Sequence, residues 1–393
     1  GLVGSEMCIR DSYNPTKIYF GKDSLGNLRE ELKNYGKNIL LVYGGGSIKR
    51  IGLYDKVIAI LQEGQKNIIE CSGVMPNPTL DKMLEGAALA RENQVDLILA
   101  VGGGSVIDCA KGMSVAAYAG ENAFHRFWLE FEPIQHPVIP VASILTMVGT
   151  GSEMNGGSVI TDTQHKIKTG RVFPPCVYPK FSILNPEYTY TVSEYQMVSG
   201  IFDIMSHLME QYFSGDDDNV SDYLIEALLQ NLIVSTEKAL KNPKDYEARS
   251  NIMWDATIAL NTLVGCGKEQ DWEVHNIEHQ LGAYTDCAHG MGLAAISVPY
   301  YRHIYSYGLD KFVRFAENVW KISSEGRTKE ETALAGIDAL AAFIRNSNMA
   351  TTLKELGATR EMLPLIAESC FEGGCYKKVS HSEILEILEE CYE

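Results

Sequence analysis

The chain has 393 residues, of which 45% are hydrophobic and 22% charged, and this length predicts two or three domains rather than one core. It has 34 Lys and Arg residues against 51 Asp and Glu residues, a formal net charge of −17. Such an acidic surface repels phosphate backbones and argues against nucleic acid as a partner. No apolar run reaches the length that crosses a membrane.

Nine cysteines are scattered along the chain without a CxxC motif. Their number is odd and no secretory signal precedes them, so we expect reduced thiols in a cytoplasmic protein. Residues 1–12 show no periodicity, and the chain opens on Gly1 rather than Met. We expect this segment to be either a non-native leader or a short disordered one, with the fold beginning at Tyr13.

Hydrophobic strands alternate with helices through the first half of the chain. Apolar runs predict strands at 16–20, 38–43, 67–70, 95–101, 137–142 and 181–184. Helical periods predict helices at 25–35, 53–63, 79–93 and 107–117. This alternation is typical of a parallel, Rossmann-like sheet with helices on both faces.

Two Gly-Gly-Gly-Ser turns, at 44–47 and 102–105, follow predicted strands and precede helices. Glycines let the backbone approach a nucleotide phosphate, and a helix N-terminus attracts the anion. One such turn needs no ligand, but two at the carboxyl ends of strands in one sheet favour a dinucleotide site. Neither turn matches GxGxxG, because Lys49 and Ile107 stand where the third glycine would be.

The first turn carries no carboxylate for a ribose 2′-hydroxyl, although NAD sites usually place an acid there. Ser47 offers a hydroxyl, and Lys49 and Arg50 follow it. This combination favours a 2′-phosphate and therefore NADP(H), unless the two cations are only solvated residues at a helix start. A second polar, glycine-rich segment at 146–158 is either a loop or a loop that opens a helix, and its hydroxyls suit a ribose or a phosphate.

The pattern changes at Thr191, where the sequence to Glu194 is typical of a capping box. Helical periods then follow almost without strand signal, at 194–213, 220–240, 245–264, 272–284, 310–323, 330–346 and 360–370. We therefore predict an α/β dinucleotide-binding domain over residues 13–190. An all-helical domain follows over residues 191–393.

Five candidate metal ligands lie in two clusters of the helical half. Asp203 and His207 are four residues apart, as are His275 and His279, and residues at this spacing share one helix face. His289 follows after a short loop. A lone histidine is usually an ordinary polar residue, but five such residues in two compact clusters favour a metal site.

From Tyr13 to its end, the chain resembles the iron-containing (group III) alcohol dehydrogenases, and most of all their NADPH-dependent butanol dehydrogenase and aldehyde reductase branch. The matching motifs are GGGSxxDxAK at 102–111, TGSExN at 150–155, FDIMSHxxEQY at 202–212 and HxxxHxxxxxxxxxHG at 275–290. The resemblance implies an α/β nucleotide domain followed by an all-helical metal domain, the dehydroquinate synthase-like fold.

The resemblance also implies roles for individual residues. It assigns one divalent metal, Fe²⁺ or Zn²⁺, to Asp203, His207, His275 and His289. His279 matches a histidine near the nicotinamide and substrate that is not a ligand, and we expect it to relay protons. The residues matched to cofactor binding are Gly45, Gly46, Ser47, Gly103, Gly104, Ser105, Asp108, Thr146, Thr150, Asn155 and Lys168, with Lys166 as the alternative lysine.

The implied function is that of a metal-dependent, NADP(H)-linked alcohol dehydrogenase or aldehyde reductase that acts on butanol-like primary alcohols, as a cytoplasmic homodimer. The metal would polarise the substrate oxygen while hydride moves between the nicotinamide and the carbonyl carbon. One alternative is an enzyme of the same fold acting on a phosphorylated or polyol substrate, but the metal-site stretches lack cations and Lys268 is the nearest. Another is a catalytically inactive metal- or nucleotide-binding protein.

Overall fold

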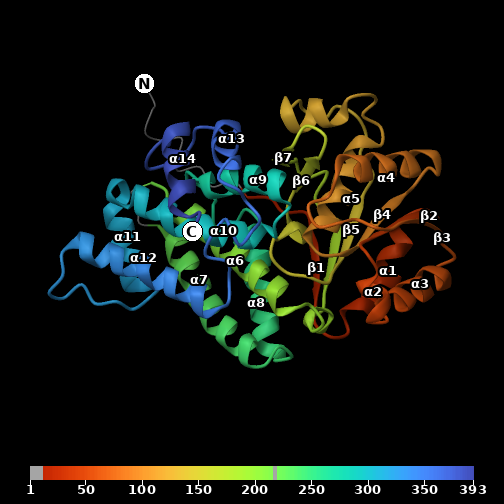
Figure 1. The fold of residues 1–393 in the computed structure, drawn as a ribbon. Helices are drawn as coiled ribbons and strands as arrows, with labels where there is room; N and C mark the ends of the chain where they lie inside the picture. Colours follow the sequence, from red (N-terminus) through yellow and green to blue (C-terminus); the bar gives the residue numbers. More distant parts are fainter. Residues whose placement is uncertain (1–11, 216–218) are drawn as a thin grey trace, which may run out of the picture. The chain divides into compact units, whose positions relative to one another are not determined.

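The computed structural model describes residues 12–215 and 219–393, and the chain divides into two compact units (Figure 1). One unit runs from Tyr13 to Val192 and the other from Ser193 to Glu393. The sequence predicts a domain boundary between residues 190 and 191. The expectation for residues 1–12 falls, apart from Ser12, outside the described residues.

A parallel six-stranded sheet forms the first unit, in the order β1-β8-β5-β4-β2-β3 (Figure 1). Its strands are β1 (Lys17–Phe20), β2 (Asn38–Tyr43), β3 (Asn67–Cys71), β4 (Leu97–Gly102), β5 (Val141–Leu145) and β8 (Phe181–Leu184). The chain leaves β2 towards β3 on one side, whereas it leaves the neighbouring β4 towards β5 on the other. The winding therefore reverses between β2 and β4, the position at which open α/β sheets bind ligands.

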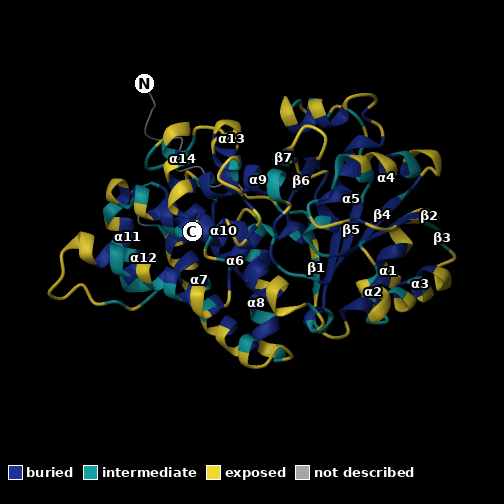
Figure 2. Cartoon of the chain, in the orientation of Figure 1, coloured by how far each residue is buried: buried dark blue, intermediate teal, exposed yellow. Residues whose placement is uncertain are grey.

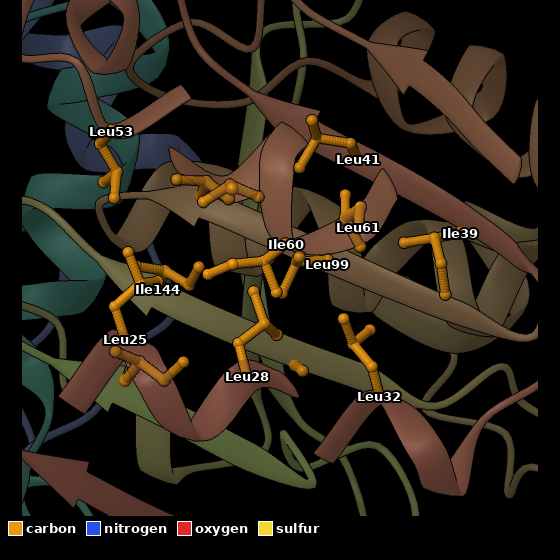
Figure 3. Packing of buried hydrophobic residues seen from close by; sticks show 14 of the residues in the cluster. Leu25, Leu28, Leu32, Ile39, Leu41, Leu53, Ile60, Leu61, Leu99 and Ile144 are labelled. Carbon is orange, nitrogen blue, oxygen red and sulfur yellow. The ribbon is translucent and has the colours of Figure 1, made fainter. Parts of the chain in front are cut away.

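Helices cover both faces of this sheet (Figure 1). They are α1 (Leu28–Glu31), α2 (Ser47–Arg50), α3 (Leu53–Glu63), α4 (Leu80–Glu92) and α5 (Gly104–Ala116). Alternate side chains of the strands pack against leucines and isoleucines of the α1 and α3 region, as Figure 3 shows. Burying one Leu or Ile side chain stabilises the fold by roughly 1.5–3 kcal/mol, and this gain determines which face of each strand points into the core. The predicted α/β architecture is confirmed for this unit.

Three sequence predictions in this unit are wrong in detail. The predicted loop at 146–158 holds a 3₁₀ turn at Ser152–Met154, and an antiparallel hairpin of β6 (Gly157–Asp162) and β7 (Ile167–Val172) follows. The glycines and polar residues of these strands weaken their sequence signal. The strand predicted at 137–142 is β5, which begins later, and the helix predicted at 25–35 is a single α-helical turn between two 3₁₀ turns.

The second unit is all-helical, as predicted. Its helices are α6 (Glu194–Tyr212), α7 (Val220–Lys241), α8 (Tyr246–Ala259), α9 (Glu273–Thr285), α10 (His289–Ile304), α11 (Leu309–Asn318), α12 (Lys329–Asn346), α13 (Met362–Ser369) and α14 (His381–Glu390). Every residue of α6 from Met197 to Tyr212 is buried, and Figure 2 shows this helix in the colour of buried residues. Its polar residues are therefore enclosed by protein.

The capping-box prediction at Thr191 is wrong, because Ser193 caps α6 and accepts a hydrogen bond from the Gln196 N–H at 3.3 Å. The sequence also missed α10 and α14. None of the helices in the described part of the chain is long and apolar enough to cross a bilayer. All eight cysteines among the described residues are free thiols, and Cys8 lies outside those residues.

Candidate active site

Three helices of the second unit bring histidines to one buried carboxylate. Asp203 and His207 lie one turn apart on α6, and His207 Nε2 is 3.2 Å from Asp203 Oδ1. His275 comes from α9, and His289 is the first residue of α10. Their Nε2 atoms each lie 3.5 Å from the same Asp203 oxygen. The structure therefore gathers all four residues that the resemblance matches to metal ligands.

The donor atoms of this cluster fit a divalent metal. Asp203 Oδ1 and His275 Nε2 are buried, and within the described residues neither has a hydrogen-bond partner. Buried polar atoms are normally paired, so these two require another kind of partner. Ligand atoms of Asp203, His275 and His289 lie within 4.8 Å of one another. That spacing suits one ion held at about 2.0–2.2 Å from each donor.

The charges at the site also suit a cation. Burial would raise the pKa of Asp203, but the surrounding histidines outweigh burial and hold it below its ordinary value, so the carboxylate is ionised. Burial lowers the pKa of His207 to about 4, which keeps that ring neutral. Burial would likewise lower the pKa of His275, but Glu210 and Asp203 raise it to about 10. Ligands must be deprotonated, so His275 would give up a proton on binding metal.

His279 lies one turn beyond His275 on α9, beside the ligand rings. Its ring centroid is 6.2 Å from that of His275 and 5.6 Å from that of His289. Trp272, just before α9, closes another side of the cluster, with its ring edge-on to His207 at 6.0 Å and to His275 at 5.3 Å. The structure thus places His279 beside His275 and His289, and its role near nicotinamide and substrate stays a prediction.

Sequence reasoning missed two glutamates at the site. Glu210 accepts a hydrogen bond from Nδ1 of His275, and Glu278 accepts one from Nδ1 of His289. Both carboxylate side chains are fully buried. Spacing is the signal that could have found them, since Glu210 follows Asp203 by seven residues and Glu278 follows His275 by three.

The two glycine turns of the first unit follow neighbouring strands, since Tyr43 at the end of β2 pairs with Val101 of β4. Gly46 has a φ of 105° and is the N-cap residue of α2. Gly103 is the N-cap residue of α5 and offers no capping side chain, which suits an anion at that helix N-terminus. Gly104 leaves room for Thr150, because an added Cβ would lie 2.3 Å from the threonine hydroxyl oxygen. The predicted turn residues therefore share one edge of the sheet.

Asp108 and Asn155 make hydrogen bonds within the nucleotide unit. Asp108 accepts hydrogen bonds from Ser152 Oγ and, at 3.0 Å, from the Val159 N–H. The fully buried ammonium of Lys111 donates to Ser152 Oγ at 2.7 Å and to Asn155 Oδ1 at 3.2 Å. These contacts hold the polar segment that starts near Thr146 against α5. Sequence reasoning missed Lys111 and Ser152, although both lie in the quoted motifs.

Two predicted cations lie at different places. Lys168 is buried in β7 opposite Thr161, on the hairpin rather than on a glycine turn. Lys49 stays beside the first turn, with its Nζ 5.2 Å from the centroid of the Tyr43 ring and 4.5 Å from that of Tyr54. A hydrogen bond with Tyr43 is the main cause that raises the pKa of Lys49. This exposed lysine therefore carries a positive charge near the turn.

The chain matches known proteins over most of its length. Residues 15–186 match the family described as iron-containing alcohol dehydrogenase, and residues 197–392 match the C-terminal part of that family. A probable NADH-dependent butanol dehydrogenase 1 of Bacillus subtilis is 40% identical over 381 residues, which cover 96% of this chain and 98% of that protein. The NADPH-dependent aldehyde reductase YqhD of Escherichia coli is 34% identical over 385 residues, 97% of this chain and 98% of that one.

Solved structures show the same fold. The crystal structure of NADH-dependent butanol dehydrogenase A from Thermotoga maritima superposes with a TM-score of 0.93 at 34% identity, and the match covers 98% of this chain and 99% of that one. The likeness extends over both units.

Proposed function

Because the chain belongs to the family of iron-containing alcohol dehydrogenases, nicotinamide-linked enzymes that interconvert alcohols and aldehydes, we propose that it is a metal-dependent, NADP(H)-linked dehydrogenase of butanol-like primary alcohols. The observation that carries this proposal is the convergence of three histidine Nε2 atoms on one buried, ionised aspartate oxygen. No hydrogen bond within the described residues satisfies that oxygen.

The metal, Fe²⁺ or Zn²⁺, is proposed to be held by Asp203 Oδ1 and by Nε2 of His207, His275 and His289. When bound, it would supply a Lewis acid for the substrate oxygen. Asp203 contributes the one negative charge among the proposed ligands, and burial strengthens its attraction to a cation by excluding water. The half-buried imidazole of His279 is proposed to pass a proton between the substrate oxygen and water.

The cofactor is proposed to bind at the edge formed by β2 and β4, with NADP(H) preferred to NAD(H). Gly45 brings no acid to the first turn, and Lys49 adds a positive charge beside it. The relatives carry both kinds of name, since the Bacillus protein is called NADH-dependent and the Escherichia protein NADPH-dependent. The preference is therefore tested by comparing kcat/KM for NADPH and NADH on linear C2–C8 aldehydes.

The metal role is tested by Asp203→Asn, with Asp255→Asn as the matched control because Asp255 is also a buried aspartate of the helical unit. After reconstitution with Fe²⁺ or Zn²⁺, we expect elemental analysis to show that Asp203→Asn has lost the metal. Its rate of aldehyde-dependent NADPH oxidation should fall by at least 100-fold. The control should keep both. Full activity of a metal-free Asp203→Asn protein would contradict the proposal.

The alternative of a phosphorylated substrate finds no support at the metal cluster. Lys268, the cation nearest in sequence, is buried in an ion pair with Asp222 at 2.5 Å. It is therefore committed to a carboxylate rather than to a substrate phosphate. The inactive-scaffold alternative predicts no NADPH turnover on the aldehyde panel. The homodimer expected from the resemblance stays a prediction, which sedimentation velocity would check.

A further inference from the structure

Each imidazole in the metal cluster has a second nitrogen that faces away from Asp203. For His275 and His289 this nitrogen is Nδ1, and each meets a fully buried glutamate, Glu210 and Glu278 respectively. A carboxylate oxygen accepts a hydrogen bond from an N–H, so in both contacts Nδ1 is the donor. A neutral ring that carries its proton on Nδ1 has its lone pair on Nε2, the atom that lies 3.5 Å from Asp203 Oδ1.

We infer that Glu210 and Glu278 are positioning residues for the metal site, an inference that rests on the proposed metal-dependent function. They hold two of the three histidines in the tautomer and orientation that a metal needs. Neither glutamate is proposed to touch the metal or the substrate.

Glu210 ties the N-terminal part of α9 to α6. Its Oε1 accepts from His275 Nδ1 and, at 2.7 Å, from the Ser206 hydroxyl on its own helix. Its Oε2 accepts from the His275 backbone N–H at 3.2 Å, and its carbonyl oxygen accepts from the Asp271 N–H at 3.0 Å. One residue of α6 therefore fixes both the ring and the backbone of His275.

Glu278 makes the corresponding link from α9 to α10. Glycines allow this close approach, since an added Cβ on Gly292 would lie 2.7 Å from Glu278 Cγ. Gly290 likewise packs on α6, where an added Cβ would lie 1.8 Å from the Ser199 carbonyl oxygen. The two glutamates thus form a chain of contacts from α6 through His275 and Glu278 to His289.

His207 lacks such a carboxylate, and this difference makes Glu210 more important for the metal site than Glu278. Its Nδ1 is buried, and among residues 12–215 and 219–393 it has no hydrogen-bond partner. Its ring instead stacks on His275, with centroids 4.9 Å apart and planes 12° apart. Because Glu210 orients His275, it also orients the surface against which His207 packs. Loss of Glu210 should therefore disturb two ligands, whereas loss of Glu278 should disturb one.

The test compares Glu→Leu and Glu→Gln at both positions, with Glu226→Gln as control. Glu226 is a buried glutamate of the same unit that binds Tyr212 and Arg314, away from the histidines. Affinity for Zn²⁺ is measured by competition with a chelator, and the visible spectrum of the Co²⁺-loaded protein reports ligand geometry. We expect the Leu variants to bind metal about 10- to 100-fold more weakly, with the larger loss at Glu210. Gln keeps an acceptor oxygen and should recover part of the affinity.

A merely structural role gives a different result. It would lower the thermal midpoint of the metal-free proteins while leaving the metal affinity of the folded fraction and the Co²⁺ spectrum as in the wild type, and that outcome overturns the inference. The Gln variants keep the side-chain volume of Glu, so they still test the inference if the Leu variants do not fold. If Asp203→Asn loses metal and all glutamate variants bind it normally, only this inference fails. If the wild type binds no divalent metal, the proposed function fails and takes the inference with it.

Discussion

Asp255 should make the stability of the helical unit depend on pH. It lies in α8 with its side chain buried, and the Asn231 side-chain amide on α7 donates to both carboxylate oxygens at 3.1–3.2 Å. Burial raises its pKa from 3.8 to about 7, and the Asn231 hydrogen bond offsets only part of that rise. The folded state therefore favours the protonated carboxyl.

The sign of the effect follows from the two pKa values. Stability from the protonated form is fully present below the unfolded pKa of 3.8, and it is lost as pH rises through the folded value of about 7. The difference of about three units corresponds to roughly 4 kcal/mol at 1.36 kcal/mol per unit. Integrated between pH 5 and pH 8, the loss is about 2–3 kcal/mol.

Asp255→Asn removes the titrating group while preserving its shape. We expect urea unfolding to show a free-energy gap between variant and wild type that widens by about 2–3 kcal/mol from pH 5 to pH 8, in favour of the variant. Asp338→Asn is the control, because the Asp338 side chain is 64% exposed. A gap for Asp255→Asn that stays constant over this range would refute the assignment of a raised pKa.

Two further predictions concern the nucleotide unit. Gly45→Asp should lower kcat/KM for NADPH at least tenfold relative to NADH, because the new carboxylate repels a 2′-phosphate. The substitution fits the fold, since an added Cβ meets nothing within 4 Å. An unchanged ratio of the two kcat/KM values would contradict the proposed position of the 2′-phosphate. Lys111→Met removes the buried donor of Ser152 and Asn155. We expect the Kd for NADPH, measured by fluorescence titration, to rise about tenfold. The unfolding free energy should fall by about 1–3 kcal/mol. Exposed Lys33→Met is its control, and equal affinities in the two variants would sink the second prediction.

Local periodicity was enough to predict the layers of the fold and the proximity of Asp203 and His207. β4 and, from Ile39 onward, β2 are buried and apolar, so their place in a covered parallel sheet follows from elementary patterning. Asp203 and His207 could be paired because a helix repeats its face every three to four residues, and the structure places them 3.2 Å apart. Such inferences need no knowledge of what packs against the helix.

Elements that depend on tertiary packing escaped sequence reasoning. α10 contains Pro299 and begins with His289-Gly290-Met291-Gly292, so its own propensity argues against a helix. Packing against α6 and α9 outweighs that propensity, and the glycines that weaken the helix locally are those that permit the contact.

Glu210 and Glu278 show most clearly where sequence reasoning stops. Both stand at helical spacings from a candidate ligand, seven residues after Asp203 and three after His275, whereas the histidine argument used only spacings of four. What spacing could not supply is the partner, because each glutamate meets a histidine of a different helix. A buried carboxylate is costly unless a donor is held against it. The histidines thus explain why two buried acids are tolerated, just as the acids explain why the rings point their Nε2 atoms to one place.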